Sequence, residues 1–425
     1  MKATLVIKDI DNLITLKGEN KPRIKETLKD IGIIKNGIIA LNGEKIIYIG
    51  EGALPSNIMM DEDTIVLDGK GKTVTPGLVD SHTHVVHGGS RENELAMKLK
   101  GVPYLDILAA GGGIHSTVKS TRTATFEELY NQANKSLNIM LEFGVTTVEA
   151  KSGYGIDDFD TELKQLEVAN QLNKDHPIDI VSTFMAAHAI PKEYKENSDE
   201  FVDIIIEDMI PEVSKRNLAK FCDVFCEEGV FTIDQSRRIL LAAREYGMGA
   251  KLHADEIEPL GGAELAAEVG CITADHLIAA SDAGITQMAE KGVIANLLPG
   301  TSFNLQTGKF ARAKKMIEEG VPIALSTDYN PGSCPTENLQ LIMSFAALIY
   351  KLTPEEVITA VTINGASALG LEKEIGSLEL GKQGDIVIFD APNLEYVLYH
   401  FGINHTDKVI KKGKIVYEKL KPLFN

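Results

Sequence analysis

The sequence contains no tryptophan and only four cysteines among 425 residues. Cysteines this sparse exclude a disulfide scaffold for a chain of this length. No apolar run approaches the roughly 20 residues that a membrane helix needs, and the N-terminal segment MKATLVIKDIDNLITL lacks the features of a signal peptide. We therefore expect a cytoplasmic protein. Cys222 and Cys226 lie four residues apart in KFCDVFCEEG, where reduced core thiols are favoured over metal ligands.

Positive charge is also scarce. The chain has 43 Lys and Arg against 61 Asp and Glu, which gives a net charge of −18. Such a field repels phosphate backbones and anionic lipid surfaces, so we expect neither nucleic acid nor membrane as a partner. It also repels small anions. An anionic substrate would therefore need local positive charge in its binding site.

The two ends of the chain share one style of sequence, short β-rich runs separated by glycine. The segment IGIIKNGIIALNGEKIIYIG has two apolar runs around Asn-Gly dipeptides, the strongest short signal for a β-hairpin. GSLELGKQGDIVIFD and DKVIKKGKIVYEKL, near the C-terminus, have the same character. We predict that residues 1–75 and 373–425 pair in one small, discontinuous β domain.

Residues 76–372 have a different rhythm, in which short apolar runs end in polar residues and are followed by helix-compatible stretches. This alternation predicts an α/β fold, a (β/α)8 barrel, for this second and larger domain. The runs are LVDSHTH (78–84), TTVEAKSGYG (146–155), IVSTFMAAHA (180–189), FCDVFCEEG (221–229), GAKLHADE (249–256), CITADHL (271–277), VIANLLPG (293–300) and PIALSTD (322–328).

Five of the ten histidines fall at the ends of these runs, where a barrel places its active site. They are His82, His84, His188, His253 and His276, and the eighth run ends in Asp328. Imidazoles with one carboxylate form a ligand set for zinc or iron that leaves a position for water. We expect the other five, His87, His115, His176, His400 and His405, to be surface, loop or packing residues.

The motifs occur in an order that identifies a family. PGLVDSHTH, SREN, AGGGIHSTV, KSGYG, CDVFCEEGVFT, HADE, LGGAELAAE, ADHL, LLPGTSF and STDYNPGS resemble the imidazolonepropionase family of the amidohydrolase superfamily, over most of the chain. Ser81 and His115 depart from the expected forms of these motifs. The resemblance implies that the β segments at the two ends form a small β-sandwich beside the barrel.

The resemblance also implies an activity, hydrolysis of the cyclic amide of 4-imidazolone-5-propanoate to N-formimidoyl-L-glutamate in histidine degradation. One Zn²⁺ or Fe²⁺/Fe³⁺ ion per chain is implied, with a small anionic substrate. The matching metal ligands are His82, His84, His253 and Asp328. The matching substrate contacts are Arg91, Tyr154, His188, Glu256, Asn330, Gly332 and Ser333. Acid and base roles fall on Glu256, His276 and Asp328, and which of them is the base stays open.

Two alternatives stay open from the sequence. The same residue types would serve a deaminase of the superfamily acting on a cyclic amidine, and a barrel without activity could act as an assembly scaffold. Because some relatives bridge two metals with a carboxylated lysine, Lys151 and Lys251 also need an assignment; we expect one metal, with Lys151 structural or near the substrate. The glycine-rich segment 101–122 is expected to be a loop or lid, with a turn at Gly111–Gly113. The sequence leaves the oligomeric state open, with a homodimer as one possibility, because twofold dimers are the commonest oligomers.

Overall fold

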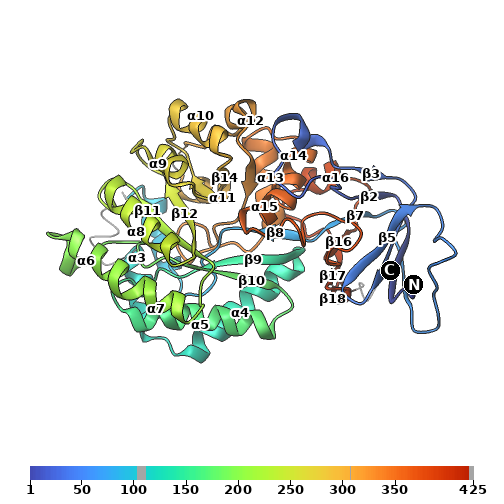
Figure 1. Ribbon diagram of the computed structural model, residues 1–425, viewed down its shortest axis with the longest axis horizontal. Coiled ribbons are helices and arrows are strands. Elements are labelled where there is room, and N and C mark those ends of the chain that lie inside the picture. The colour runs from blue at the N-terminus through green and yellow to red at the C-terminus, as the bar shows by residue number, and fades with distance from the viewer. Residues whose placement is uncertain (103–111, 307, 421–425) are drawn as a thin grey trace.

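The computed structural model describes residues 1–102, 112–306 and 308–420, and within these ranges the chain forms three sheets (Figure 1). The largest has eight parallel strands in sequential order, with helices between them, which is the (β/α)8 barrel predicted from the sequence. Its strands are β8 (Leu78–Asp80), β9 (Val145–Lys151), β10 (Asp179–Phe184), β11 (Phe221–Cys226), β12 (Gly249–Ala254), β13 (Thr273–His276), β14 (Ile294–Leu297) and β15 (Ile323–Leu325).

The barrel closes between β8 and β15, at the residues that follow each strand. The backbone amide of Asp328 donates to the carbonyl of His82 at 3.1 Å. Two residues before His82, at the end of β8, the buried carboxylate of Asp80 accepts from the amide of Thr327 at 3.0 Å and from its hydroxyl at 2.7 Å. Closure therefore places the residues after the first barrel strand directly beside those after the last.

Helices follow every barrel strand. Three of them begin with a capping box, in which a threonine and a Glu or Gln three residues later satisfy each other's backbone amides: Thr125 with Glu128, Thr232 with Gln235, and Thr353 with Glu356. No helix in the described part of the chain is both long and apolar enough to span a bilayer. The helices around the barrel are α1 (Leu95–Leu99), α3 (Ile114–Thr123), α4 (Phe126–Glu142), α5 (Phe159–Asp175), α6 (Ser198–Ile204), α7 (Ile210–Lys215), α8 (Ile233–Glu245), α9 (Gly262–Val269), α10 (Asp282–Lys291), α11 (Pro299–Leu305), α12 (Ala313–Glu319), α13 (Leu339–Ile349), α14 (Pro354–Ala360) and α15 (Ile363–Ala368). Shorter turns are the 3-10 helices η1 (Lys25–Lys29), η2 (Glu92–Glu94) and η3 (Lys192–Tyr194), and the π-helix η4 (Ile205–Met209) joins α6 to α7.

Strands from both chain ends form two further sheets beside the barrel, at the right of Figure 1. Alternating apolar residues of the two sheets meet in one core, so they form the predicted β-sandwich. The first sheet, in the order β5-β4-β1-β6, contains β1 (Leu5–Ile10), β4 (Gly37–Asn42), β5 (Lys45–Glu51) and β6 (Ile65–Asp68). The second, in the order β18-β17-β16-β7-β2-β3, contains β2 (Asn12–Ile14), β3 (Ile33–Ile34), β7 (Thr73–Pro76), β16 (Ile386–Phe389), β17 (Thr406–Lys411) and β18 (Lys414–Glu418). The short helix α16 (Leu394–Tyr399) connects β16 to β17.

The structure differs from the sequence-based expectation in two places. The strands are shorter than the apolar runs, so His82 and His84 follow β8 rather than end it, and His188 lies four residues beyond β10. The sequence predicts a loop or lid for the glycine-rich segment 101–122. Residues 103–111 lie outside the described residues, but Ile114–Thr123 forms α3, with Gly113 at its N-cap in the left-handed region at φ 65°.

Candidate metal centre and substrate site

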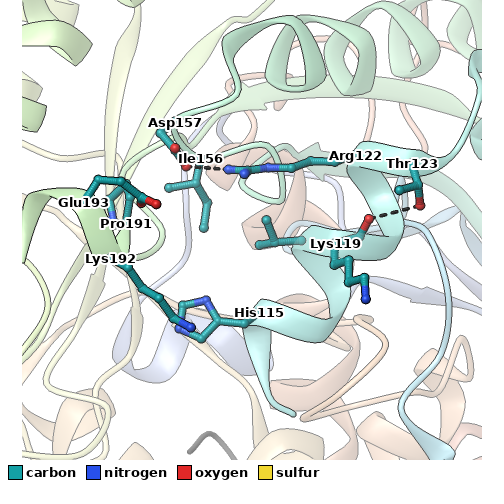
Figure 2. A pocket seen from close by; sticks show the side chains of 10 residues that line it. His115, Lys119, Arg122, Thr123, Ile156, Asp157, Pro191, Lys192 and Glu193 are labelled. Atoms are coloured by element: carbon teal, nitrogen blue, oxygen red, sulfur yellow. Dashed lines mark hydrogen bonds and ion pairs between the residues drawn. The ribbon is translucent and has the colours of Figure 1, made fainter. Parts of the chain in front are cut away.

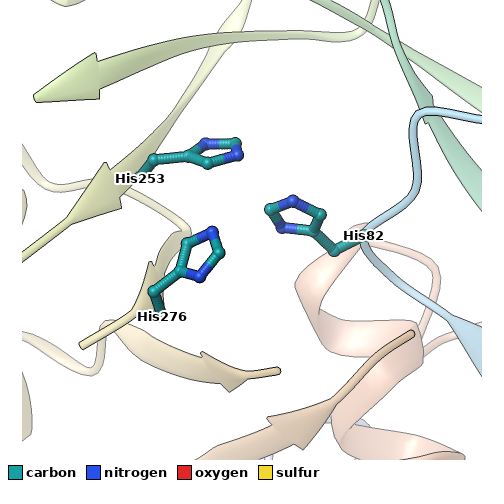
Figure 3. Close-up of side chains that lie close together, drawn as sticks. All are labelled: His82, His253 and His276. Atoms are coloured by element: carbon teal, nitrogen blue, oxygen red, sulfur yellow. The ribbon is translucent and has the colours of Figure 1, made fainter. Parts of the chain in front are cut away.

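Imidazoles from several barrel strands converge at the C-terminal ends of the strands. Figure 3 shows His82, His253 and His276 with their rings turned toward one another. The ring centroids of His82 and His253 are 4.6 Å apart, and those of His253 and His276 are 5.2 Å apart. His84 stacks on His188 with centroids 4.9 Å apart and an interplanar angle of 13°. All five of these histidines are thus brought together at one end of the barrel.

These side chains offer ligand atoms at the spacing of a metal site. His82, His84 and Asp328 present atoms within 4.8 Å of one another, and so do His82, His253 and His276. Asp328 Oδ1 is 3.4 Å from His82 Nε2 and 3.8 Å from His84 Nε2. Within the described residues, the buried Nε2 of His82 has no hydrogen-bond partner. Because an unpaired buried nitrogen costs free energy, a cation at this position fits the residues present.

Two of these histidines are bonded to buried carboxylates through Nδ1. His82 Nδ1 lies 2.6 Å from Asp275 Oδ2, and His253 Nδ1 lies 3.1 Å from Asp223 Oδ1. An ionised carboxylate only accepts hydrogen bonds, so Nδ1 carries the proton and Nε2 keeps its lone pair. This carboxylate–imidazole pairing is the usual support of a metal-ligating histidine.

The three residues predicted for acid and base chemistry have shifted pKa values. Burial, with a smaller contribution from Asp328, raises the pKa of Glu256 to about 8. Burial also raises the pKa of Asp328 to about 6, against a hydrogen bond that its carboxylate accepts from Thr301 at 2.6 Å. Burial and then His253 hold the pKa of His276 well below its ordinary value, so this imidazole is neutral. Its Nδ1 lies 3.6 Å from Glu256 Oε1.

The backbone at this site is conformationally strained. His276 and Asp328 have φ values of 71° and 55°, in the left-handed region that non-glycine residues rarely adopt. Each such residue costs of the order of 1–3 kcal/mol and persists where surrounding contacts fix it. Here the bonds that close the barrel and the Thr301 hydroxyl fix Asp328.

The Tyr154 loop lies against the histidine cluster. The Tyr154 ring is 5.7 Å from that of His84 and 5.4 Å from that of His188. His188 Nδ1 donates to the carbonyl of Gly153 at 3.1 Å, and a Cβ at Gly153 would lie only 2.7 Å from this nitrogen. Gly153, at φ 112°, is therefore needed for the close approach of His188.

Arg91 lies beside the loop that follows Asp328. Its Nε donates to Glu94 Oε1 at 3.1 Å, and the same oxygen accepts from the amide of Gly113 at 2.7 Å. A Cβ at Gly332 would overlap the Arg91 guanidinium, so glycine at 332 leaves room for this side chain. Arg91, predicted from the resemblance, is thus held next to the Asp328 loop.

Asn330 folds this loop. Its side-chain oxygen accepts from the amides of Gly332 and Ser333 at 2.9 and 2.7 Å, and its nitrogen donates to the Asp328 carbonyl at 2.7 Å and to Ser333 Oγ at 2.8 Å. These four hydrogen bonds show that Asn330 fixes the backbone of the loop from Asp328 to Ser333.

A pocket of about 340 Å³ lies outside the histidine cluster, between α3 and the loops after β9 and β10 (Figure 2). Arg122, on its wall, donates to the carbonyl of Gly155 at 2.7 Å and pairs with Asp157. None of the residues predicted for the site lines this pocket. The pocket is linked to the site through Arg122, because Gly155, which this side chain bonds, belongs to the Tyr154 loop.

Sequence reasoning missed the carboxylates that organise the site. Glu162 accepts from the amides of Gly153, Gly155 and Ile156, at 2.7 to 3.1 Å, and so fixes the Tyr154 loop. Three further carboxylates bond to side chains of the site: Glu94 to Arg91, Asp223 to His253 and Asp275 to His82. The sequence carries no special signal for these residues, because they are carboxylates in a strongly acidic chain.

The chain matches the amidohydrolase family over residues 73–416. An imidazolonepropionase of Alkaliphilus metalliredigens is 63% identical over 419 residues, 99% of each chain. An imidazolonepropionase of Fusobacterium nucleatum is 54% identical, over 99% of this chain and all of that one.

Solved structures support the fold alone. An adenosine deaminase from Xanthomonas campestris with bound zinc superposes with a TM-score of 0.69 at 19% identity, over 97% of this chain and 93% of that one. An atrazine chlorohydrolase from Arthrobacter aurescens, complexed with zinc, gives a TM-score of 0.69 at 15% identity, over 99% of this chain and 97% of that one.

Proposed function

This chain belongs to the imidazolonepropionase family of amidohydrolases, and on that basis we propose that it hydrolyses the ring amide of 4-imidazolone-5-propanoate to N-formimidoyl-L-glutamate in histidine degradation. The observation that carries the proposal is the near full-length identity to imidazolonepropionases, 63% in one case. The convergence of the motif residues at one end of the barrel supports it.

The chemistry needs one metal ion, zinc or iron, for which His82, His84, His253 and Asp328 are the proposed ligands. Such an ion supplies hydroxide at neutral pH and polarises a carbonyl group. The Nδ1 bonds to Asp275 and Asp223 keep His82 and His253 in the tautomer that ligation requires.

The proton transfers are assigned to two carboxyl groups. Asp328, whose carboxylate lies beside His82 and His84 and accepts from Thr301, takes the proton of the attacking water. Glu256 is largely protonated at pH 7, because its pKa is about 8, and it gives its proton to the departing ring nitrogen as the C–N bond breaks. Neutral His276 donates a hydrogen bond to the carbonyl oxygen as negative charge develops there.

Substrate recognition is assigned to a guanidinium and two rings. Arg91 uses Nε for Glu94, and its two terminal nitrogens are the proposed fork for the propanoate group. Tyr154 and His188 flank the imidazolone ring from the side of His84.

The test is incubation of metal-loaded protein with freshly prepared 4-imidazolone-5-propanoate. We expect loss of the substrate's ultraviolet absorbance and appearance of N-formimidoylglutamate, with activity lost on chelation and restored by zinc or iron. The His253→Ala variant is the matched control, in which metal content and turnover should fall together. Release of ammonia without ring opening would favour a deaminase instead, and full turnover by the His253→Ala variant would contradict the metal assignment.

A further inference from the structure

Five charged side chains lie buried in the barrel directly beneath the proposed metal centre. Their side chains have no exposed surface, and they come from four adjacent or nearby barrel strands. They are Glu149 and Lys151 on β9, Asp223 on β11, Lys251 on β12 and Asp275 on β13.

Lys151 stands at the centre of this group. Its Nζ is 2.5 Å from Asp223 Oδ2, 3.0 Å from Glu149 Oε2 and 3.5 Å from Asp275 Oδ2. Asp223 and Asp275 are also the carboxylates that accept from His253 and His82. The ammonium therefore contacts the same two carboxylates that orient the proposed metal ligands.

The groups around Lys151 resemble a ligand set for a cation. Asp223 and Asp275 present carboxylate oxygens within 4.8 Å of each other, and Glu149 adds a third carboxylate at 3.0 Å from the ammonium. Lys251 has a different environment, since its Nζ pairs with Glu149 at 2.8 Å and lies 4.9 Å from the centre of the Phe221 ring. Of the two lysines, Lys151 alone has salt bridges to the carboxylates that hold the histidines, within the described part of the chain.

We propose that the Lys151 ammonium takes the place of a second metal ion, so that the centre holds one ion and a latent second cation site is filled by the chain itself. The proposal rests on the metal centre proposed above. It also gives Lys151 a positioning role, because its charge keeps Asp223 and Asp275 directed at His253 and His82 without a second ion.

The charges explain why a cation is required at this place. Without Lys151, Asp223 and Asp275 would lose the ammonium that pairs with them. Lys251 would not replace it, because among the described residues its salt bridge is to Glu149 alone. Uncompensated charge in a barrel interior is strongly unfavourable. A chain with a small side chain at 151 should therefore recruit a cation from solution into the space among Asp223, Asp275 and Glu149.

The decisive measurement is the number of metal ions per chain. Wild type, Lys151→Ala and Lys251→Ala are stripped with a chelator, reloaded with excess Zn²⁺, freed of unbound metal and analysed by mass spectrometry of the metal. We expect one ion in the wild type, one in Lys251→Ala and two in Lys151→Ala. A single ion in folded Lys151→Ala overturns the proposal, and so does a second ion in Lys251→Ala.

A second variant keeps the test valid if Lys151→Ala does not fold. Lys151→Met fills the volume without the charge, so it should hold one ion, bound about 10–100-fold more weakly in chelator competition. Wild-type affinity in Lys151→Met also overturns the proposal. A wild type that binds no ion contradicts the proposed metal centre itself, so the two failures are distinguishable.

Discussion

At the scale of single residues, buried carboxylates fix the loops of this site by accepting hydrogen bonds from backbone amides. Glu162 accepts three backbone amides of the Tyr154 loop, and Asp255 accepts those of Gly261, Gly262 and Ala263 at the start of α9. Charge-assisted bonds of this kind are stronger than neutral ones. The acidic residues of the chain therefore serve partly as internal anchors that fix the backbone of loops at this end of the barrel.

Glu94 provides a test of this idea at a single residue. Its buried carboxylate joins Arg91 Nε to the amide of Gly113. The Glu94→Ala variant should raise KM about 10–100-fold with kcat within a few-fold, because a lost bond to a charged group is worth about 1.5–3 kcal/mol. Steady-state kinetics measure both constants. Glu92→Ala, at an exposed position of the same turn, should leave them unchanged.

If the Glu94→Ala variant has the same KM as the wild type, Glu94 does not contribute to substrate binding. The Glu94→Gln variant refines the result, because its side-chain oxygen still accepts from Arg91 without the negative charge. We expect its KM to lie between those of the wild type and the Glu94→Ala variant.

The sequence predicted the histidines of this site but not their supports. Histidine is rare in the chain, so His82, His253 and His276 at strand ends form a recognisable pattern. Asp223, Asp275 and Glu94 are three carboxylates among 61. Only the fold shows which carboxylates are buried against an imidazole or a guanidinium, so spacing alone could not identify them.

At the scale of elements, glycine and asparagine turns predicted the β structure of the two chain ends, and the family resemblance implied that it forms a sandwich. The hairpin of β4 and β5 turns at Gly43, and that of β17 and β18 turns at Lys412 and Gly413. Helix α3 was missed because IHSTVKSTRT is rich in β-branched and hydroxyl residues of modest helix propensity. Its buried Thr117, Val118 and Thr121 pack against the protein, so tertiary contacts stabilise this helix more than propensity does.

The contact between two hairpin turns gives a prediction for the β-sandwich. Gly413 has φ 73°, and a Cβ there would overlap the carbonyl oxygen of Gly43. The Gly413→Ala variant should lower the free energy of unfolding by about 2–3 kcal/mol, through both backbone strain and this overlap. Urea denaturation measures the loss, and kcat should stay unchanged because the turn lies in the β-sandwich, away from the histidine cluster.

Gly381 is the matched control for this turn. Its φ is 82°, but nothing lies within 4 Å of an added Cβ. The Gly381→Ala variant should therefore cost about 1 kcal/mol, from backbone strain alone. Equal losses in the two variants would show that the contact between the turns contributes nothing to stability.

For the whole molecule, the net charge of −18 and the proposed anionic substrate are compatible because charge is distributed unevenly. Arg91 is held by Glu94 beside the loop that follows Asp328, and in the proposed function its guanidinium would meet the propanoate group. Close groups in a partly buried site outweigh distant surface charges, which salt screens beyond about 10 Å at 0.1 M. The net charge therefore indicated that nucleic acid and anionic membranes are disfavoured partners. It gave no information about the local charge of the site.

The buried histidines make the stability of the whole molecule depend on pH. Burial lowers the pKa of His87 and of His176 to about 4. Each ring accepts a hydrogen bond that protonation would remove, His87 from Gln132 at 3.3 Å and His176 from the amide of Ile178 at 3.1 Å. Because the folded pKa lies below the unfolded value of about 6.5, this stability is present above pH 6.5 and is lost as the pH falls toward 4.

His176 allows this dependence to be measured apart from the metal site. Between pH 7 and pH 5, the wild type should lose about 1–2 kcal/mol of unfolding free energy through this one residue. Urea denaturation of metal-free wild type and His176→Asn protein measures the loss of unfolding free energy between pH 7 and pH 5 in each. The loss in the wild type minus the loss in the variant is the contribution of His176. Asparagine does not titrate, so the variant should show the smaller loss even if it is less stable at both pH values. Equal losses in the two proteins would mean that His176 is protonated in the folded chain as readily as in the unfolded one.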